Sequence, residues 1–149
     1  NPGFVEISRR LGAEKLYEYV KAFGFSKKTG VDLVGESSGI FFDYEDYGEL
    51  ENATTAFGQG ISTTAIQLVR AFCALINGGT LYVPKISKSL ILTSTQEVLF
   101  DFPTAIEREN VISKETSGLM RYALESVVSK GSGRKAYIEG YKVGGKTGF

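Results

Sequence analysis

Five residues near the end of the chain, Gly144-Gly145-Lys146-Thr147-Gly148, combine a cationic side chain, a hydroxyl and three glycines in one short run. A lysine ammonium supplies positive potential for a carboxylate and can assist proton transfer nearby. The Thr147 hydroxyl can donate a hydrogen bond to the same carboxylate, and Gly148 leaves room for a peptide that lies along a strand. Because the run follows the alternating segment Tyr141-Lys142-Val143, we expect residues 140–148 to form a strand with an anion-binding corner.

A second Lys-Thr-Gly tripeptide, Lys28-Thr29-Gly30, shows that these three residue types are weak evidence by themselves. It lies in a stretch that is interrupted by glycines, and its composition is typical of a turn with Gly30 at positive φ. We interpret it as a turn. For Lys146 the simple alternative is an exposed edge strand that happens to carry a lysine, so the wider pattern of motifs has to separate the two interpretations.

Length and composition indicate one globular domain. The chain has 149 residues, of which 42% are apolar and 12% aromatic. Its 17 basic and 17 acidic residues cancel, which argues against a general nucleic-acid binder. Since the chain has no histidine, Ser-His-Asp and Cys-His catalysis and most zinc sites are excluded, and we expect no cofactor. No apolar run approaches 18 residues, so we expect no membrane contact from this chain, although an anchor elsewhere stays open.

The spacing of apolar residues predicts three helices. The first covers residues 4–24 with Gly24 as its C-cap, and residues 25–60 follow as an irregular stretch rich in glycine. The second helix is capped by Ser62 or Thr63, ends at Asn77-Gly78-Gly79 and contains Cys73, which we expect to be buried.

The pattern changes to a period of two after Thr80, which predicts strands up to Phe100 with a turn at residues 94–97. Ser113 then caps the third helix, which ends at Gly131-Ser132-Gly133. Helices and strands in this order predict one α+β unit.

The order of short motifs along the whole chain resembles the transpeptidase domain of class B penicillin-binding proteins. The motifs that carry the resemblance are Asn1-Pro2, Phe23-Gly24-Phe25, Lys28-Thr29-Gly30, Asp32-Leu33 with Gly35-Glu36, Gly58-Gln59-Gly60-Ile61-Ser62-Thr63-Thr64, Gln67-Leu68, Asn77-Gly78-Gly79-Thr80-Leu81, Pro84, Gly131-Ser132-Gly133, Ala136 and residues 140–148. The resemblance implies the penicillin-binding transpeptidase or serine β-lactamase-like fold, with helices packed on an antiparallel sheet.

The family's site residues map onto both ends of this chain. In the family, the serine of Ser-x-x-Lys attacks the D-Ala-D-Ala carbonyl of a peptidoglycan stem peptide, and the asparagine of Ser-x-Asn holds the substrate amide and shares in proton transfer. By resemblance Asn1 is that asparagine and a catalytic residue, together with Lys146. Lys146 and Thr147 bind the terminal carboxylate, and Gly148 permits its close approach. The backbone N–H of Phe149 joins the oxyanion hole, at a position where the family usually has threonine. Gly58-Gln59-Gly60 is expected to be scaffold.

The nucleophile is missing from the chain. Ser132-Gly133-Arg134-Lys135 has the spacing of Ser-x-x-Lys, but it contains a glycine, follows a helix stop and occupies a different position in the family pattern. We therefore expect residues 1–149 to be the C-terminal portion of one transpeptidase domain, from the Ser-x-Asn asparagine to the Lys-Thr-Gly strand. The serine would lie upstream, and the isolated piece would be inactive.

The expected function is that of a peptidoglycan D,D-transpeptidase, which cross-links stem peptides through a serine acyl-enzyme and is acylated by β-lactams. The resemblance favours the sporulation-type subfamily. It implies a location on the extracytoplasmic face of a bacterial membrane through an anchor outside this chain, with cell-wall synthesis proteins as possible partners. Two alternatives stay open: a β-lactamase or β-lactam sensor domain, and a non-catalytic peptide- or protein-binding module that docks through the acidic residues 32–51.

Overall fold

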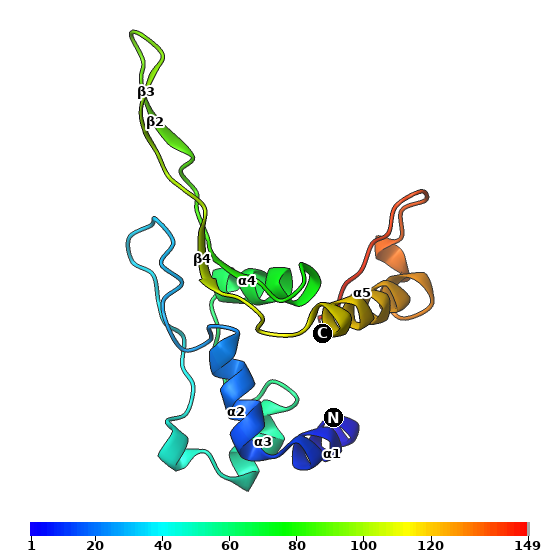
Figure 1. The fold of residues 1–149 in the computed structure, drawn as a ribbon. Coiled ribbons are helices and arrows are strands. Elements are labelled where there is room, and N and C mark those ends of the chain that lie inside the picture. Colours follow the sequence, from blue (N-terminus) through cyan, green and yellow to red (C-terminus); the bar gives the residue numbers. More distant parts are fainter. Residues whose placement is uncertain (149) are drawn as a thin grey trace.

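The computed structural model describes residues 1–148 and places helices and short antiparallel strands around a small core (Figure 1). The helices are α1 (Pro2–Leu11), α2 (Ala13–Ala22), α3 (Glu49–Thr55), α4 (Ala65–Ile76) and α5 (Lys114–Ser129), with short 3₁₀ turns η1 (Tyr44–Asp46) and η2 (Arg134–Ala136). The strands are β1 (Leu81–Val83), β2 (Ser89–Leu92), β3 (Glu97–Asp101) and β4 (Ala105–Arg108). This α+β composition confirms the predicted class. None of the described helices is both long and apolar enough to cross a membrane.

The N-terminal helical stretch is divided in two, whereas one helix over residues 4–24 was expected. Gly12 separates α1 from α2 with φ at 90°, a conformation that glycine adopts without strain. Gly24 has φ at 79° and follows α2, as expected of a C-terminal glycine. The periodicity of apolar residues identified the helical segment correctly, but it did not register the break.

Two elements were missed in stretches where short helices and strands carry little signal. α3 forms inside the region expected to be irregular, and the Glu51 carboxylate accepts the Gly48 N–H before its first turn. The Asn52 amide then donates to the Ser8 carbonyl oxygen at 3.2 Å, which fixes α3 to α1. β4 pairs antiparallel with β1, and this pairing supplies the return path from the hairpin to α5.

The two later helices agree closely with their sequence signals. Thr64 caps α4, one or two residues after the expected cap, and α4 ends at Asn77-Gly78-Gly79 as predicted. Gly79 has φ at 95°, and a Cβ there would collide with the Ile112 carbonyl oxygen. Ser113 caps α5 by accepting the Thr116 N–H at 3.0 Å.

The apolar core is small. Ala22, Ala74, Leu81 and Val111 form its buried cluster, and Phe23 packs against it, so α2, α4, β1 and the start of the α5 connection meet there. Cys73, expected to be buried, is exposed, because it lies on a face of α4 that no other described element covers. The α4 sequence is apolar nearly all round, yet the structure covers one side of it only.

Gln67 connects α4 to the irregular segment that precedes it. Its side chain is fully buried, and its Oε1 accepts the Thr64 N–H at 2.9 Å. Its Nε2 donates to the carbonyl oxygens of Lys27 and Ser38, both at 2.8 Å. One amide therefore completes the α4 cap and holds two points of the segment 27–38 against the helix.

Arg70 makes a second connection one turn further along α4. Its buried guanidinium donates to the Gly24 carbonyl oxygen at 3.1 Å and to the Glu107 carboxylate of β4 at 2.5 Å. Glu107 also pairs with Lys27. Burial alone would raise the pKa of the Glu107 carboxyl, but the Lys27 hydrogen bond and the charges of Arg70 and Lys27 hold that pKa below its usual value.

Replacing Gln67 by alanine should destabilise the domain, because the fully buried Gln67 side chain is removed and two partly buried carbonyl groups and the Thr64 N–H lose their partner. We expect Gln67→Ala to lower the free energy of unfolding by about 2 kcal/mol, measured by urea denaturation of the full-length protein. The control is Gln59→Ala, since Gln59 is exposed and its side chain forms no hydrogen bond within residues 1–148. Equal stabilities of the two variants would contradict the assigned role.

The lowered pKa of Glu107 predicts a dependence of stability on pH. A carboxyl whose pKa is lower in the folded state stabilises the fold above its unfolded-state pKa, and that contribution is lost as the pH falls through the folded-state value. We therefore expect the free energy of unfolding to fall as the pH drops below about 4.5, the ordinary value of this carboxyl. Glu107→Gln should flatten part of that fall, whereas the exposed Glu139→Gln should leave the pH profile unchanged. A wild-type profile for Glu107→Gln would refute the assignment.

Candidate active-site segments

The segment that carries Lys146 is positioned by α5. The Gly145 N–H donates to the Leu124 carbonyl oxygen at 3.1 Å. A Cβ on Gly144 would lie 3.1 Å from the backbone of Leu124 and Glu125, so a glycine is what allows this close approach. The expected strand over residues 140–148 is wrong for the described residues: this stretch has no regular secondary structure, because no neighbouring strand is present to pair with it.

Lys146, Thr147 and Gly148 are all exposed. The Lys146 ammonium donates to the Thr147 carbonyl oxygen at 2.7 Å, and the Thr147 hydroxyl forms no hydrogen bond with another residue of 1–148. The arrangement leaves a cation and a hydroxyl next to each other and open to an incoming anion. The predicted role of the Phe149 backbone N–H lies outside the described residues.

Asn1 is exposed and begins α1 as its N-cap. Its carbonyl oxygen accepts the N–H groups of Phe4 and Val5 at 2.9 and 3.1 Å, but its side chain makes no capping hydrogen bond. An asparagine at this position usually uses its side chain for the cap. Here the amide is left available for another partner. No hydrogen bond joins Asn1 to residues 146–148 in the described part of the chain.

The Gly58-Gln59-Gly60 segment is held as a turn between α3 and α4. Gly58 and Gly60 have φ at 91° and 77°, and a Cβ on Gly60 would lie 2.7 Å from the Phe42 ring. The Gln59 N–H donates to the Thr54 carbonyl oxygen at 3.0 Å. These contacts fit the expected scaffold role.

Aromatic rings of α2 and of residues 41–47 form a cluster that the sequence analysis did not identify. The ring of Tyr17 on α2 lies 5.1–5.3 Å from the rings of Phe41, Tyr44 and Tyr47, and the Phe42 ring lies 5.9 Å from that of Phe41. The run Phe41-Phe42-Asp43-Tyr44 was the available signal. The cluster joins α2 to the stretch before α3 through ring contacts.

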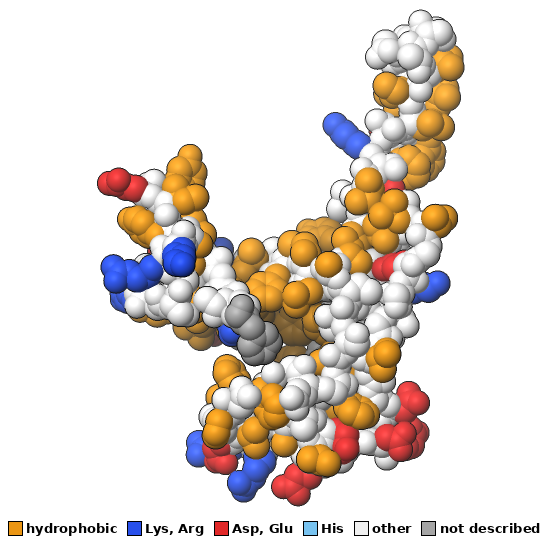
Figure 2. Space-filling model, turned by 180° about the vertical axis from the view of Figure 1, so that it is seen from behind, with side chains coloured by type: hydrophobic (Ala, Val, Ile, Leu, Met, Phe, Trp, Pro, Cys, Tyr) orange, Lys and Arg blue, Asp and Glu red, His pale blue; other side chains and the backbone are white. Residues whose placement is uncertain are grey.

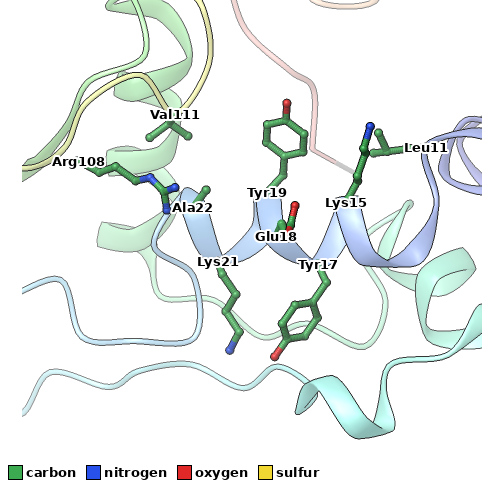
Figure 3. A pocket seen from close by; sticks show the side chains of 9 residues that line it. All are labelled: Leu11, Lys15, Tyr17, Glu18, Tyr19, Lys21, Ala22, Arg108 and Val111. Carbon is green, nitrogen blue, oxygen red and sulfur yellow. The ribbon is translucent and has the colours of Figure 1, made fainter.

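Two hollows lie near these segments, and neither contains a predicted site residue. The larger, about 600 Å³, runs along α2 (Figure 3). There Tyr19 and Lys15 point to one side of the helix and Tyr17 and Lys21 to the other, with Arg108 and Val111 near its end. A smaller groove of about 250 Å³ lies between α4, α5 and the final segment. Its lining consists of Phe72, Ile76, Arg121, Leu124, Glu125, Lys142, Gly144 and Gly145. The groove therefore adjoins the Lys146 corner without including it.

Two carboxyl groups with lowered pKa values hold loops in place. The Asp32 carboxylate accepts the N–H groups of Ile86 and Ser87, each at 2.8 Å, and these bonds hold its pKa far below the usual range. The Thr29 hydroxyl is the main reason why the pKa of Glu36 is lowered, and the backbone N–H groups of Thr29 and Gly30 lower it further. Gly30 has φ at 77°, as predicted, but Lys28-Thr29-Gly30 is an irregular segment and not the predicted turn. No group of three or more potential metal ligands occurs among residues 1–148.

Comparison with known proteins agrees with the expected family. The family model of the penicillin binding protein transpeptidase domain matches residues 1–149. The chain is 57% identical to stage V sporulation protein D of Bacillus subtilis over 148 residues, which cover 99% of this chain and 23% of that protein. It is 30% identical to the peptidoglycan D,D-transpeptidase FtsI of Escherichia coli, again over 99% of this chain and 23% of the relative. The chain thus spans about a quarter of the length of these relatives.

Solved structures show the same fold. Penicillin binding protein 3 of Mycobacterium tuberculosis, complexed with aztreonam, is 28% identical with a TM-score of 0.78, over 95% of this chain and 30% of that one. A peptidoglycan glycosyltransferase from Burkholderia ambifaria is 26% identical with a TM-score of 0.79, over 98% of this chain and 43% of that one. The predicted fold and the predicted resemblance, including its sporulation-type preference, are confirmed. The chain belongs to the penicillin-binding protein transpeptidase domain family.

Proposed function

We propose that the protein carrying this chain is a serine D,D-transpeptidase, which cross-links peptidoglycan stem peptides through an acyl-enzyme and is acylated by β-lactams. The match of the family model to all 149 residues carries the proposal. The relatives named as D,D-transpeptidases and the relative complexed with aztreonam support it. The anchor would lie outside this chain and place the domain on the extracytoplasmic face of a bacterial membrane, and the similarity to stage V sporulation protein D favours a role in sporulation.

The exposed donors at the C-terminal end fit a carboxylate-binding corner. Lys146 supplies a charge in water-accessible surroundings, and Thr147 supplies a hydroxyl that no residue of 1–148 engages. A substrate carboxylate could accept from both, as charge-assisted hydrogen bonds are the stronger kind. Gly148 has no Cβ to block that approach, and the Phe149 backbone N–H would complete the oxyanion hole.

The amide of Asn1 fits the second corner. Since the α1 cap does not use this side chain, it can hold a substrate amide and orient groups that exchange a proton. The serine and lysine of Ser-x-x-Lys would come from the preceding part of the protein. Asn1 and Lys146 would then face the nucleophile from two sides, each bound to a different part of the substrate.

Uncovered apolar surface supports the proposal that residues 1–149 are the C-terminal portion of a larger domain. Figure 2 shows apolar side chains gathered over α4 in the hollowed middle of one face. Val69 on α4 is 59% exposed, and Leu119 and Tyr122 on α5 are 64% and 66% exposed. A contiguous apolar patch of this kind is uncommon on the surface of a complete, monomeric domain. In the proposed domain the remaining chain covers it and supplies the strands that the Lys146 segment lacks.

Labelled penicillin tests the function and the role of Lys146 together. The full-length protein should form a covalent adduct, and Lys146→Ala should slow acylation about 10²-fold or more, because the positive charge at the reacting centre is lost. The matched control is Lys28→Ala in the other Lys-Thr-Gly tripeptide, which should label at the wild-type rate. A full-length protein that never labels would favour the non-catalytic binding module. Fast hydrolysis of the adduct would instead favour the β-lactamase alternative.

The 149-residue chain by itself should form no adduct and should associate with copies of itself, because its exposed apolar faces have no cover. Sedimentation velocity over a range of concentrations measures this, and a denaturation curve that shifts with concentration should accompany it. A monomer with a sharp unfolding transition that is independent of concentration would contradict the proposed domain boundaries.

A further inference from the structure

The β2–β3 hairpin stands away from the rest of the molecule as an arm, defined here as residues 88–102 (Figure 1). Within residues 1–148, no hydrogen bond or ion pair joins residues 89–101 to anything outside the arm. The arm closes on itself: the Phe102 N–H donates to the Lys88 carbonyl oxygen at 2.9 Å, and the Gln96 N–H donates to the Leu92 carbonyl oxygen at 2.7 Å in the turn. Among the helices and strands, β2 and β3 pack mainly against each other.

Both faces of the arm are apolar. Leu90 lies opposite Phe100 across the two strands, and Ile91 lies opposite Val98. The register shifts between Leu90 and Ile91, so the faces are assigned within β3 alone. Neighbouring residues of a strand point to opposite faces, so Val98 and Phe100 lie on one face of β3 and Leu99 lies on the other. The six apolar side chains of the strands are 42–55% exposed, namely Leu90, Ile91, Leu92, Val98, Leu99 and Phe100. An isolated two-stranded hairpin is marginally stable in water, so these side chains need cover on two sides.

The base of the arm is anchored, which gives the arm a set direction. The Asp32 carboxylate accepts the N–H groups of Ile86 and Ser87, each at 2.8 Å, and so ties the entrance of the arm to the segment 27–38. Gln67 holds that segment on α4. Gln67 and Asp32 together fix the first residues of the arm relative to α4. The arm can therefore present its side chains to another molecule in a defined direction.

Charge limits what can cover the arm. Glu97 and Asp101 lie at the two ends of β3 and are the only charged residues from 89 to 101, and Lys88 at the base is the only basic residue of the arm. No Lys or Arg in that range could face anionic lipid headgroups, which disfavours insertion into a bacterial membrane. A symmetric pairing of two β3 strands would set Glu97 of one copy against Asp101 of the other, so self-association is also disfavoured. The occupant should instead carry basic residues.

We propose that the arm docks into an apolar cleft on a partner protein, which encloses both faces of the hairpin and is bordered by Lys or Arg opposite Glu97 and Asp101. Figure 2 shows the apolar side chains running along the length of the arm. A cleft explains apolar residues on both sides, whereas a flat surface would cover one side only. The interaction is independent of the acyl-enzyme chemistry, because no predicted site residue belongs to the arm.

Site-specific photocrosslinking in the native host tests the docking. A benzophenone amino acid replaces Leu99 in the full-length protein, and the control carries it at Val34, an apolar loop residue that is more exposed than Leu99. We expect irradiation to join position 99, but not position 34, to one partner protein. Crosslinks that contain only lipid, only a second copy or only another segment of the same chain would overturn the proposal, as would no crosslink at all.

Binding of the purified partner to the full-length protein then tests the chemistry. The double change Leu90→Ser with Phe100→Ser should weaken binding at least tenfold, and so should Glu97→Lys with Asp101→Lys. Val34→Ser should have no effect. Thermal unfolding and the rate of labelling by penicillin should match wild type in all variants, which separates docking from folding and from the proposed activity. Unchanged affinity in both arm variants would refute the proposal. Binding to phosphatidylglycerol vesicles that Phe100→Ser abolishes would assign the arm to the membrane instead.

Discussion

The buried polar side chains of α4 are the contacts on which the rest of the fold depends. The segment between α2 and α3 has little regular secondary structure, so its carbonyl groups must find other partners when they are buried. Gln67 and Arg70 supply these partners from two successive turns of one helix. Arg70 also reaches Glu107 on β4, so the same helix sets the position of the loop and of the β1–β4 pair. Removing either side chain would leave several partly or fully buried groups without a partner, which is why two residues have such wide influence.

The composition of α4 also indicates what surrounds it. Its sequence, Ala65–Ile76, is apolar apart from Gln67 and Arg70, and both polar side chains are used on the covered side. A helix that is apolar all round normally lies inside a protein. Here Val69 and Cys73 face outward, and the apolar groove toward α5 stays open. The exposed apolar face of α4 is consistent with the proposal that this chain is part of a larger domain.

Local signals predicted the helices well because their determinants lie within a few residues. Ser113 caps α5 and Asn77-Gly78-Gly79 ends α4 through neighbouring backbone groups. These helix ends can therefore be predicted from the local sequence. Elements that depend on distant partners were less predictable. β4 exists because β1 lies beside it, and residues 140–148 have the alternation of a strand but no partner among the described residues. The predicted site shares this limit: the order of motifs identified the family, whereas motif order does not say how Asn1 and Lys146 lie relative to each other.

The two Lys-Thr-Gly tripeptides show how the same residues take different roles. In the first, the Thr29 hydroxyl and the N–H groups of Thr29 and Gly30 all donate to the Glu36 carboxylate. The tripeptide therefore already binds a carboxylate, but one supplied by its own chain six or seven residues later. In the second, no residue of 1–148 engages the Thr147 hydroxyl, and Lys146 stays exposed. The two tripeptides therefore differ in occupancy: an acid of the same chain engages the donors of the first, whereas no residue of 1–148 engages the Thr147 hydroxyl of the second.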